Sequence, residues 1–193
     1  MSEAPAPGST MVFIVYNTNA DAVARGYEPW LVETDCPFFN AIPGISHYAN
    51  WKIEGEAPFR YFDFLVVEDG RLHDVWFDRN LDAFRANWVK LWGYGDAPLP
   101  MHRYSHVTRT VRANYGLGVD RGWISLGTGE PPAELPTVFV VEGSLAKHFA
   151  GSTEPWHAPL SERAPLGYDW VGFSPERPAA GDLVLSTFAI ARP

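Results

Sequence analysis

Residues 27–68, YEPWLVETDCPFFNAIPGISHYANWKIEGEAPFRYFDFLVVE, decide the fold that the sequence predicts. Pro43 restricts the residue before it to extended geometry, and Gly44 supplies the free φ of a turn, so a helix that precedes them must end here. Apolar and more polar side chains alternate over residues 45–54, which is the period of two that a strand shows. Residues 59–68 predict a second strand, so the stretch predicts a helix followed by a hairpin.

Elements on both sides of this stretch complete a known order. Residues 11–17 are short, β-branched and almost continuously apolar, which predicts a strand. Residues 78–92 carry apolar side chains at spacings of three and four, which predicts a helix. Residues 103–112 predict a further strand because β-branched residues alternate along them. With a helix over residues 29–39, the order β-α-β-β-α-β predicts a ferredoxin-like α+β module, an antiparallel sheet with both helices on one face.

The C-terminal half of the chain, residues 113–193, predicts more strands. Three are expected at residues 135–142, 168–173 and 183–190. Because both faces of the strand over residues 59–68 are largely apolar, a second sheet must cover the first. Two alternatives are open. Either this half is a degenerate second repeat that closes a pseudo-dimeric α/β barrel within one chain, or a homodimer closes the barrel and this half is an extension.

Composition excludes several classes of function. Fifteen Lys and Arg against 23 Asp and Glu give a net charge of -8, which argues against nucleic-acid partners because their affinity comes from phosphate neutralisation. No apolar run reaches the ~18 residues that cross a bilayer, so no membrane partner is expected. Residues 1–10 predict a flexible lead-in and not a signal peptide. The single cysteine, Cys36, fits a reducing compartment, and the sequence therefore predicts a cytoplasmic protein.

Three motifs carry a resemblance to a known family. They are Tyr27 with Trp30 on the first helix, PGISHY at residues 43–48, and FRYFDFLVV at residues 59–67. With the element order over residues 11–112, this pattern resembles the dimeric α/β-barrel superfamily, and within it the RedY/HapK-type proteins of pigment and bisindole pathways. The resemblance implies a homodimer that acts in secondary-metabolite biosynthesis on an aromatic, indole- or polyketide-like intermediate. The superfamily also includes monooxygenases, aromatic cyclases and haem-handling proteins, so the fold alone does not choose a reaction.

Polar side chains on the predicted strands define a candidate pocket inside the barrel. His47 is a candidate general acid/base because imidazole titrates near neutrality. Asp63 interrupts an apolar strand, where a carboxylate is costly unless it is paired or functional. Because their strands are hairpin neighbours, we expect a catalytic His47–Asp63 dyad, with two ordinary core residues as the alternative. The residues assigned to substrate binding are Asn17, Tyr48, Asn50, Trp51, Tyr61, Tyr104 and His106.

Two classes of function follow from this pocket. The first is an acid/base enzyme of the cyclase or lyase type, which catalyses cyclisation, condensation or dehydration of a small aromatic substrate. The second is a small-molecule binding or carrier protein that uses the pocket without turnover, and a cofactor-free monooxygenase is a further alternative. No cofactor and no metal are expected, because the sequence has no Gly-rich phosphate loop, and His102 and His106 lack a chelating spacing on a strand.

Overall fold

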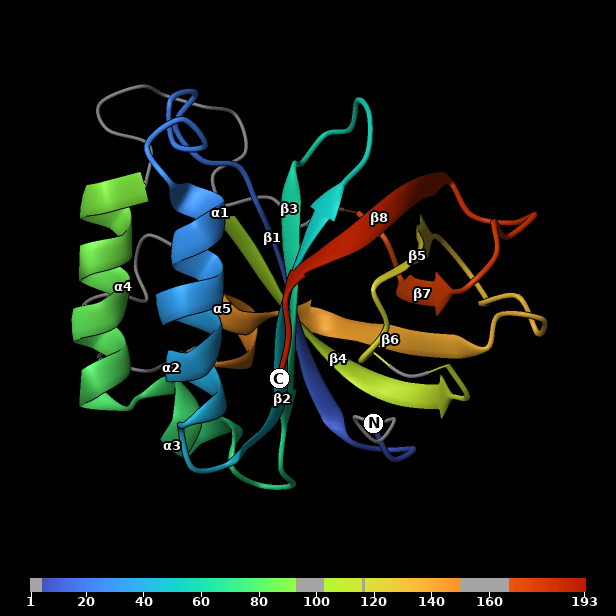
Figure 1. The fold of residues 1–193 in the computed structure, drawn as a ribbon. Coiled ribbons are helices and arrows are strands. Elements are labelled where there is room, and N and C mark those ends of the chain that lie inside the picture. The colour runs from blue at the N-terminus through green and yellow to red at the C-terminus, as the bar shows by residue number, and fades with distance from the viewer. Residues whose placement is uncertain (1–4, 93–102, 116, 150–166) are drawn as a thin grey trace.

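The computed structural model describes residues 5–92, 103–115, 117–149 and 167–193. Within these residues, eight strands form a closed barrel in the order β1-β3-β2-β8-β5-β7-β6-β4 (Figure 1). Every neighbouring pair is antiparallel. The strands are β1 (Thr10–Tyr16), β2 (Ile45–Ile53), β3 (Tyr61–Val67), β4 (Arg103–Ala113), β5 (Arg121–Gly127), β6 (Thr137–Ser144), β7 (Trp170–Ser174) and β8 (Leu183–Ala191).

The helices of the described residues lie on one side of the barrel, next to the wall that contains β1, β3 and β2 (Figure 1). The first three follow one another without a break and form the blue column of Figure 1. No helix in the described part of the chain is both long and apolar enough to cross a membrane. The helices are α1 (Tyr27–Trp30), η1 (Leu31–Asp35), α2 (Cys36–Asn40), α3 (Leu72–Trp76), α4 (Arg79–Trp92) and α5 (Leu145–His148).

The helical column changes its hydrogen bonding at its centre. η1 is a π-helical turn, in which the N–H of Cys36 donates to the carbonyl of Leu31, five residues earlier. Pro37 follows directly, and a proline has no N–H to donate and crowds the carbonyl four residues before it. The wider turn accommodates this proline. Asp35, the last residue of η1, is only 3% exposed and lies under the helical layer.

The strand residues divide between two hydrophobic cores. On β1, Val12 and Ile14 belong to the core between barrel and helices, whereas Met11 and Phe13 belong to the core inside the barrel. This division follows from the alternation of side chains along a strand. β3 is buried at all of its positions because helices cover one of its faces and the barrel interior covers the other.

Aromatic rings fill the barrel interior. The ring centroid of Trp51 lies 4.9 Å from that of Phe173 and 5.9 Å from that of Phe62. Phe64 lies 5.5 Å from Phe173 and 5.7 Å from Phe139, again between centroids. These are contact spacings for aromatic pairs. The interior of the barrel, where the sequence predicted a pocket, is therefore packed with the protein's own aromatic side chains.

The predicted ferredoxin-like α+β module is wrong. β2 pairs with β8 and β4 pairs with β6, so the first four strands belong to one eight-stranded antiparallel barrel and not to a separate sheet. This barrel closes within one chain. The N-terminal half contributes its strands in the order β4-β1-β3-β2, and the C-terminal half contributes its strands in the equivalent order β8-β5-β7-β6. The prediction also lacks β5. Gly122 and Gly127 interrupt the alternation of side chains that would have indicated this strand. A Cβ atom at Gly127 would lie 2.2 Å from Cζ2 of Trp170.

Candidate functional site

Five polar side chains meet between the barrel wall and the helical column: Tyr16, Asp35, Tyr48, Asn50 and Asp63. All are buried, and both carboxyl groups are at most 3% exposed. Tyr48 and Asn50 lie two positions apart on β2 and therefore share a face. The β2–β3 register pairs Asn50 with Asp63, and η1 brings Asp35 to the same place from the helical side. The hydroxyl, amide and carboxyl groups thus form one cluster built by four elements.

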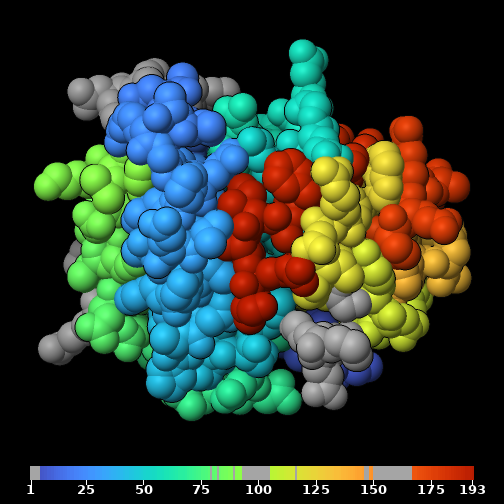
Figure 2. Space-filling model, in the orientation of Figure 1, coloured from blue at the N-terminus to red at the C-terminus, as the bar shows by residue number. Residues whose placement is uncertain are grey.

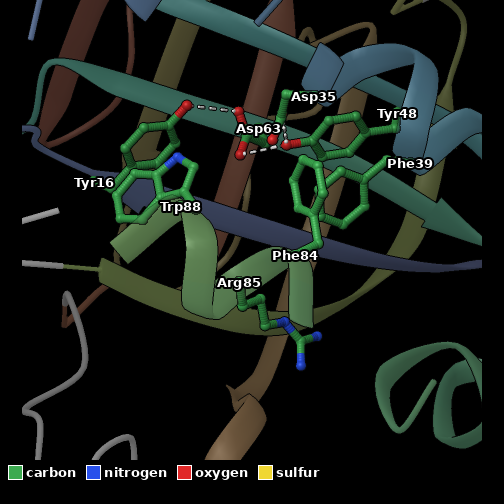
Figure 3. A pocket seen from close by; sticks show the side chains of 8 residues that line it. All are labelled: Tyr16, Asp35, Phe39, Tyr48, Asp63, Phe84, Arg85 and Trp88. Carbon is green, nitrogen blue, oxygen red and sulfur yellow. Dashed lines mark hydrogen bonds between the residues drawn. The ribbon is translucent and has the colours of Figure 1, made fainter. Parts of the chain in front are cut away.

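One tyrosine hydroxyl bridges the two carboxyl groups. Oη of Tyr48 lies 2.8 Å from Oδ2 of Asp35 and 3.0 Å from Oδ2 of Asp63, as Figure 3 shows. The amide Nδ2 of Asn50 repeats the bridge, because it lies 2.9 Å from Oδ2 of Asp35 and 2.9 Å from Oδ1 of Asp63. The same amide nitrogen lies 3.0 Å from Oη of Tyr48. The two carboxyl groups therefore share two neutral partners, Tyr48 and Asn50.

A line of donors also leads to Asp63. Nε1 of Trp88 donates to Oη of Tyr27 at 3.4 Å, the Tyr27 hydroxyl donates to Oη of Tyr16 at 3.1 Å, and the Tyr16 hydroxyl donates to Oδ1 of Asp63 at 3.2 Å. Burial raises the pKa of Tyr16 and of Tyr27 well above the usual value for tyrosine, and the negative charges of the nearby aspartates raise it further. Both phenols are thus protonated at neutral pH and serve as donors.

A small cavity opens beside this cluster. Its volume of about 10 Å³ is enough for a single water molecule. Its walls are mostly aromatic, and the ring of Phe39 stacks on that of Tyr48 at 4.2 Å between centroids and meets Phe84 at 5.7 Å. A ring-sized ligand must therefore displace a side chain, and Phe84 is the half-buried ring among them. The lining residues are Tyr16, Asp35, Phe39, Tyr48, Asp63, Phe84, Arg85 and Trp88.

The arginine of the lining is turned toward α3. Its Nη1 donates to the carbonyl of Trp76 at 3.3 Å, and Cζ of Arg85 lies 4.0 Å from the centroid of the Trp76 ring. Figure 3 shows the guanidinium directed away from Asp35 and Asp63. The cavity is thus an acidic and aromatic site with its positive group at the margin.

The structure brings together three of the residues that the sequence predicts for the site: Tyr48, Asn50 and Asp63. Tyr61 shares their face of the sheet, but its hydroxyl donates to Oε1 of Glu28 at 3.1 Å. Asn17 lies at the end of β1, where its Nδ2 donates to the carbonyl of Pro58. The side chain of Tyr104, like residue His102, lies outside the described residues.

His47 and Asp63 do not form the expected dyad. In the β2–β3 register, His47 pairs with Val66, which faces the barrel interior, whereas Asp63 pairs with Asn50 and faces the helices. The two side chains therefore project from opposite faces of the sheet. His106 pairs with Phe13 and, like Trp51, faces the interior.

Burial changes the protonation of the interior histidines. It lowers the pKa of His47 and of His106 from 6.5 to about 4, so both imidazoles are neutral at pH 7. Each is at most 5% exposed.

Asp35 is the site residue that the sequence interpretation lacks. A signal for it exists: Leu31, Asp35 and Phe39 follow at intervals of four, which is one face of a helix, and Leu31 and Phe39 are buried. A carboxylate in the middle of an apolar face is as unusual as Asp63 in an apolar strand. The π-turn that carries Asp35 is a second signal, since such turns are frequent at functional sites.

A second hollow, a groove of about 300 Å³, separates the helical column from the end of β8. Figure 2 shows the red end of β8 beside the light-blue column. Cys36 lies in its wall, where burial raises the pKa of the thiol to about 11, so this cysteine is a poor nucleophile at neutral pH. The groove is lined by Val32, Cys36, Pro37, Asn40, Ile190, Ala191, Arg192 and Pro193.

No protein-family model matches this chain, and no curated protein is significantly similar to it. The biosynthetic role that the resemblance implied, like the ferredoxin-like fold on which it depended, has no support in these findings. Within the described residues, no group of three or more His, Cys, Asp and Glu side chains could hold a metal ion. The candidate site is the carboxyl cluster of Asp35 and Asp63 with its adjoining cavity.

Proposed function

We propose that this protein is an acid/base enzyme that binds a small aromatic molecule between α2 and α4 and moves a proton with Asp35 and Asp63. The observation that carries the proposal is the position of Tyr48, whose single hydroxyl lies within hydrogen-bond distance of both carboxyl groups. In this proposal the chemistry takes place on the helix-covered face of the barrel wall and not in the barrel interior.

The hydrogen bonds of the Tyr48 hydroxyl support a single proton that is shared by the carboxyl groups of Asp35 and Asp63. Tyr48 has one hydroxyl hydrogen and can donate it to only one carboxyl group. The contact with the other carboxyl group is a hydrogen bond when that carboxyl is protonated and donates to Oη of Tyr48. Two buried carboxyl groups that contact the same hydroxyl and the same amide nitrogen disfavour double ionisation, as in other carboxylate pairs. The pair therefore fits a state with one proton and one negative charge, which can both give and accept a proton.

The lining supports an aromatic ligand. Rings from β1, β2, α2 and α4 surround the cavity, and they suit a flat apolar molecule whose reactive edge faces the carboxyl pair. The cavity is closed to anything larger than water, so binding requires the Phe84 side chain to rotate away from Phe39. Exclusion of bulk water would then strengthen the electrostatic interactions inside the site.

Deuterium exchange tests the proposal without knowledge of the natural substrate. Substituted phenols, indoles and aryl ketones are incubated in D₂O with a substoichiometric amount of protein, and carbon-bound deuterium is measured by mass spectrometry. We expect protein-dependent incorporation in at least one class, and its loss in Asp35→Asn. Ligand binding without incorporation would indicate a carrier, and neither binding nor incorporation in any class would overturn the proposal.

A further inference from the structure

The charges around the cavity favour a positive ligand. The two carboxyl groups share at most one proton between them in the state described above, so a negative charge stays at the base of the cavity. Asp63 accepts from Tyr16, Tyr48 and Asn50, which stabilise it as the ionised member. The donor line from Trp88 through Tyr27 strengthens the Tyr16 contact by polarisation.

The aromatic walls favour the same sign of charge. Ring faces attract cations through their quadrupole, and Trp is the strongest of the aromatic side chains in this respect. Tyr16 and Trp88 meet edge to face at 5.8 Å between centroids beside the carboxyl pair. Among the described lining residues the positive group is Arg85, which is held against Trp76 and directed away from Asp35 and Asp63.

We infer that the substrate is an electron-rich aromatic ring that becomes cationic when it is protonated on carbon. This inference rests on the proposed function and adds the substrate class to it. Asp35 gives the proton: its O–H bond breaks, a ring C–H bond forms, and the products are a ring cation and a carboxylate. Loss of a proton from the same ring carbon to Asp35 restores both partners. Neither step needs an oxidant or a reductant.

Three bicyclic aromatic probes test the sign of the charge. They are the cation N-methylquinolinium, the neutral 1-methylnaphthalene and the anion 1-naphthoate, and calorimetry measures their binding to the wild-type protein and to Phe84→Ala, in which the cavity is open. We expect the cation to bind roughly 10-fold more tightly than the neutral probe. The anion should bind more weakly than both.

Two aspartate variants serve as a matched pair for this measurement. Asp63→Asn should remove most of the preference for the cation, measured as the ratio of its affinity to that of 1-methylnaphthalene in the same variant. Asp169→Asn alters an exposed carboxylate that accepts from the N–H of Gly129 and should change neither affinity. Equal binding of cation and neutral probe, or a preference for the anion, would overturn the inference, as would no binding to either protein. Proton exchange without a cation preference would remove this substrate class but keep the acid/base function.

Discussion

Asp35 and Asp63 place one oxygen each at 2.9 Å from the same amide nitrogen of Asn50. One carboxyl group comes from a π-helical turn and the other from a strand in the wall of the barrel. Their approach therefore depends on how the helical column packs on the sheet. Asn50 and Tyr48 offset the desolvation of this pair, because a buried carboxyl group is tolerated where it is hydrogen-bonded.

Replacing Asn50 with leucine should destabilise the fold. The substitution removes the donor that both carboxyl groups share and leaves them less well satisfied, so we expect a loss of about 1–3 kcal/mol in the free energy of unfolding. Urea denaturation measures it. The same substitution at the exposed Asn114 is the control, with an expected change within about 0.5 kcal/mol. An Asn50→Leu protein as stable as the wild type would show that the amide does not stabilise the carboxyl pair.

Tyr48→Phe should lower the rate of proton exchange while the packing of the ring is kept. The variant keeps the ring that stacks on Phe39 but loses the hydroxyl between the carboxyl groups, so we expect deuterium exchange to fall by ~100-fold or more. Tyr61→Phe removes a hydroxyl from the same face of the sheet that contacts Glu28 and neither aspartate. Its exchange rate should remain close to that of the wild type. Equal losses in the two variants would contradict a special role for the Tyr48 hydroxyl.

The pattern of residues 45–54 predicts β2 and the shared face of Tyr48 and Asn50, and the structure confirms both. The same alternation does not predict that Asn50 pairs with Asp63, because this pairing depends on the register between β2 and β3. The β2–β3 register shifts between Ile45 and His47, and a change of register by one residue moves a side chain to the other face.

The strand pairings that close the barrel were not predicted, for a related reason. β8 pairs with β2 over a sequence separation of more than 130 residues, and its own alternation does not name a partner. Asp35 reaches Asp63 only through the packing of the column on the wall. Local periodicity predicted the long helix and every strand of the described residues except β5, whereas pairings between distant segments decided the architecture and the site.

Phe84→Ala should open the cavity. The ring of Phe84 meets Phe39 and stacks on Phe38 at 3.9 Å between centroids, so its removal leaves ring-sized space beside the carboxyl pair. We expect 1-methylnaphthalene to bind more tightly, and the free energy of unfolding to fall by roughly 2 kcal/mol or less. Phe77→Ala, a half-buried ring that packs on Phe149, should lose similar stability without the gain in affinity. Unchanged binding to the open variant would show that the ligand does not enter here.

Stability should decrease in mild acid because of the interior histidines. In the folded protein the pKa of His47 and of His106 is about 4, against 6.5 in the unfolded chain. Between these values the unfolded chain binds protons that the folded protein does not bind, so this contribution is complete above pH 6.5 and is lost as the pH falls toward 4. It amounts to about 3 kcal/mol per histidine. Urea denaturation from pH 4 to 7 should show a weaker pH dependence for His106→Gln, and an unaltered dependence would refute the assignment.

Deuterium exchange in Asp35→Asn, Asp63→Asn and the double variant tests whether Asp35 and Asp63 act as one unit on a proton. Thermal melts first establish that each variant is folded, and Asp169→Asn controls for the change of charge. We predict that each single variant loses ~100-fold or more in exchange rate, and that the double variant is no slower than the slower single one, because groups acting together give non-additive losses. A folded single variant that exchanges deuterium at the wild-type rate would contradict the account.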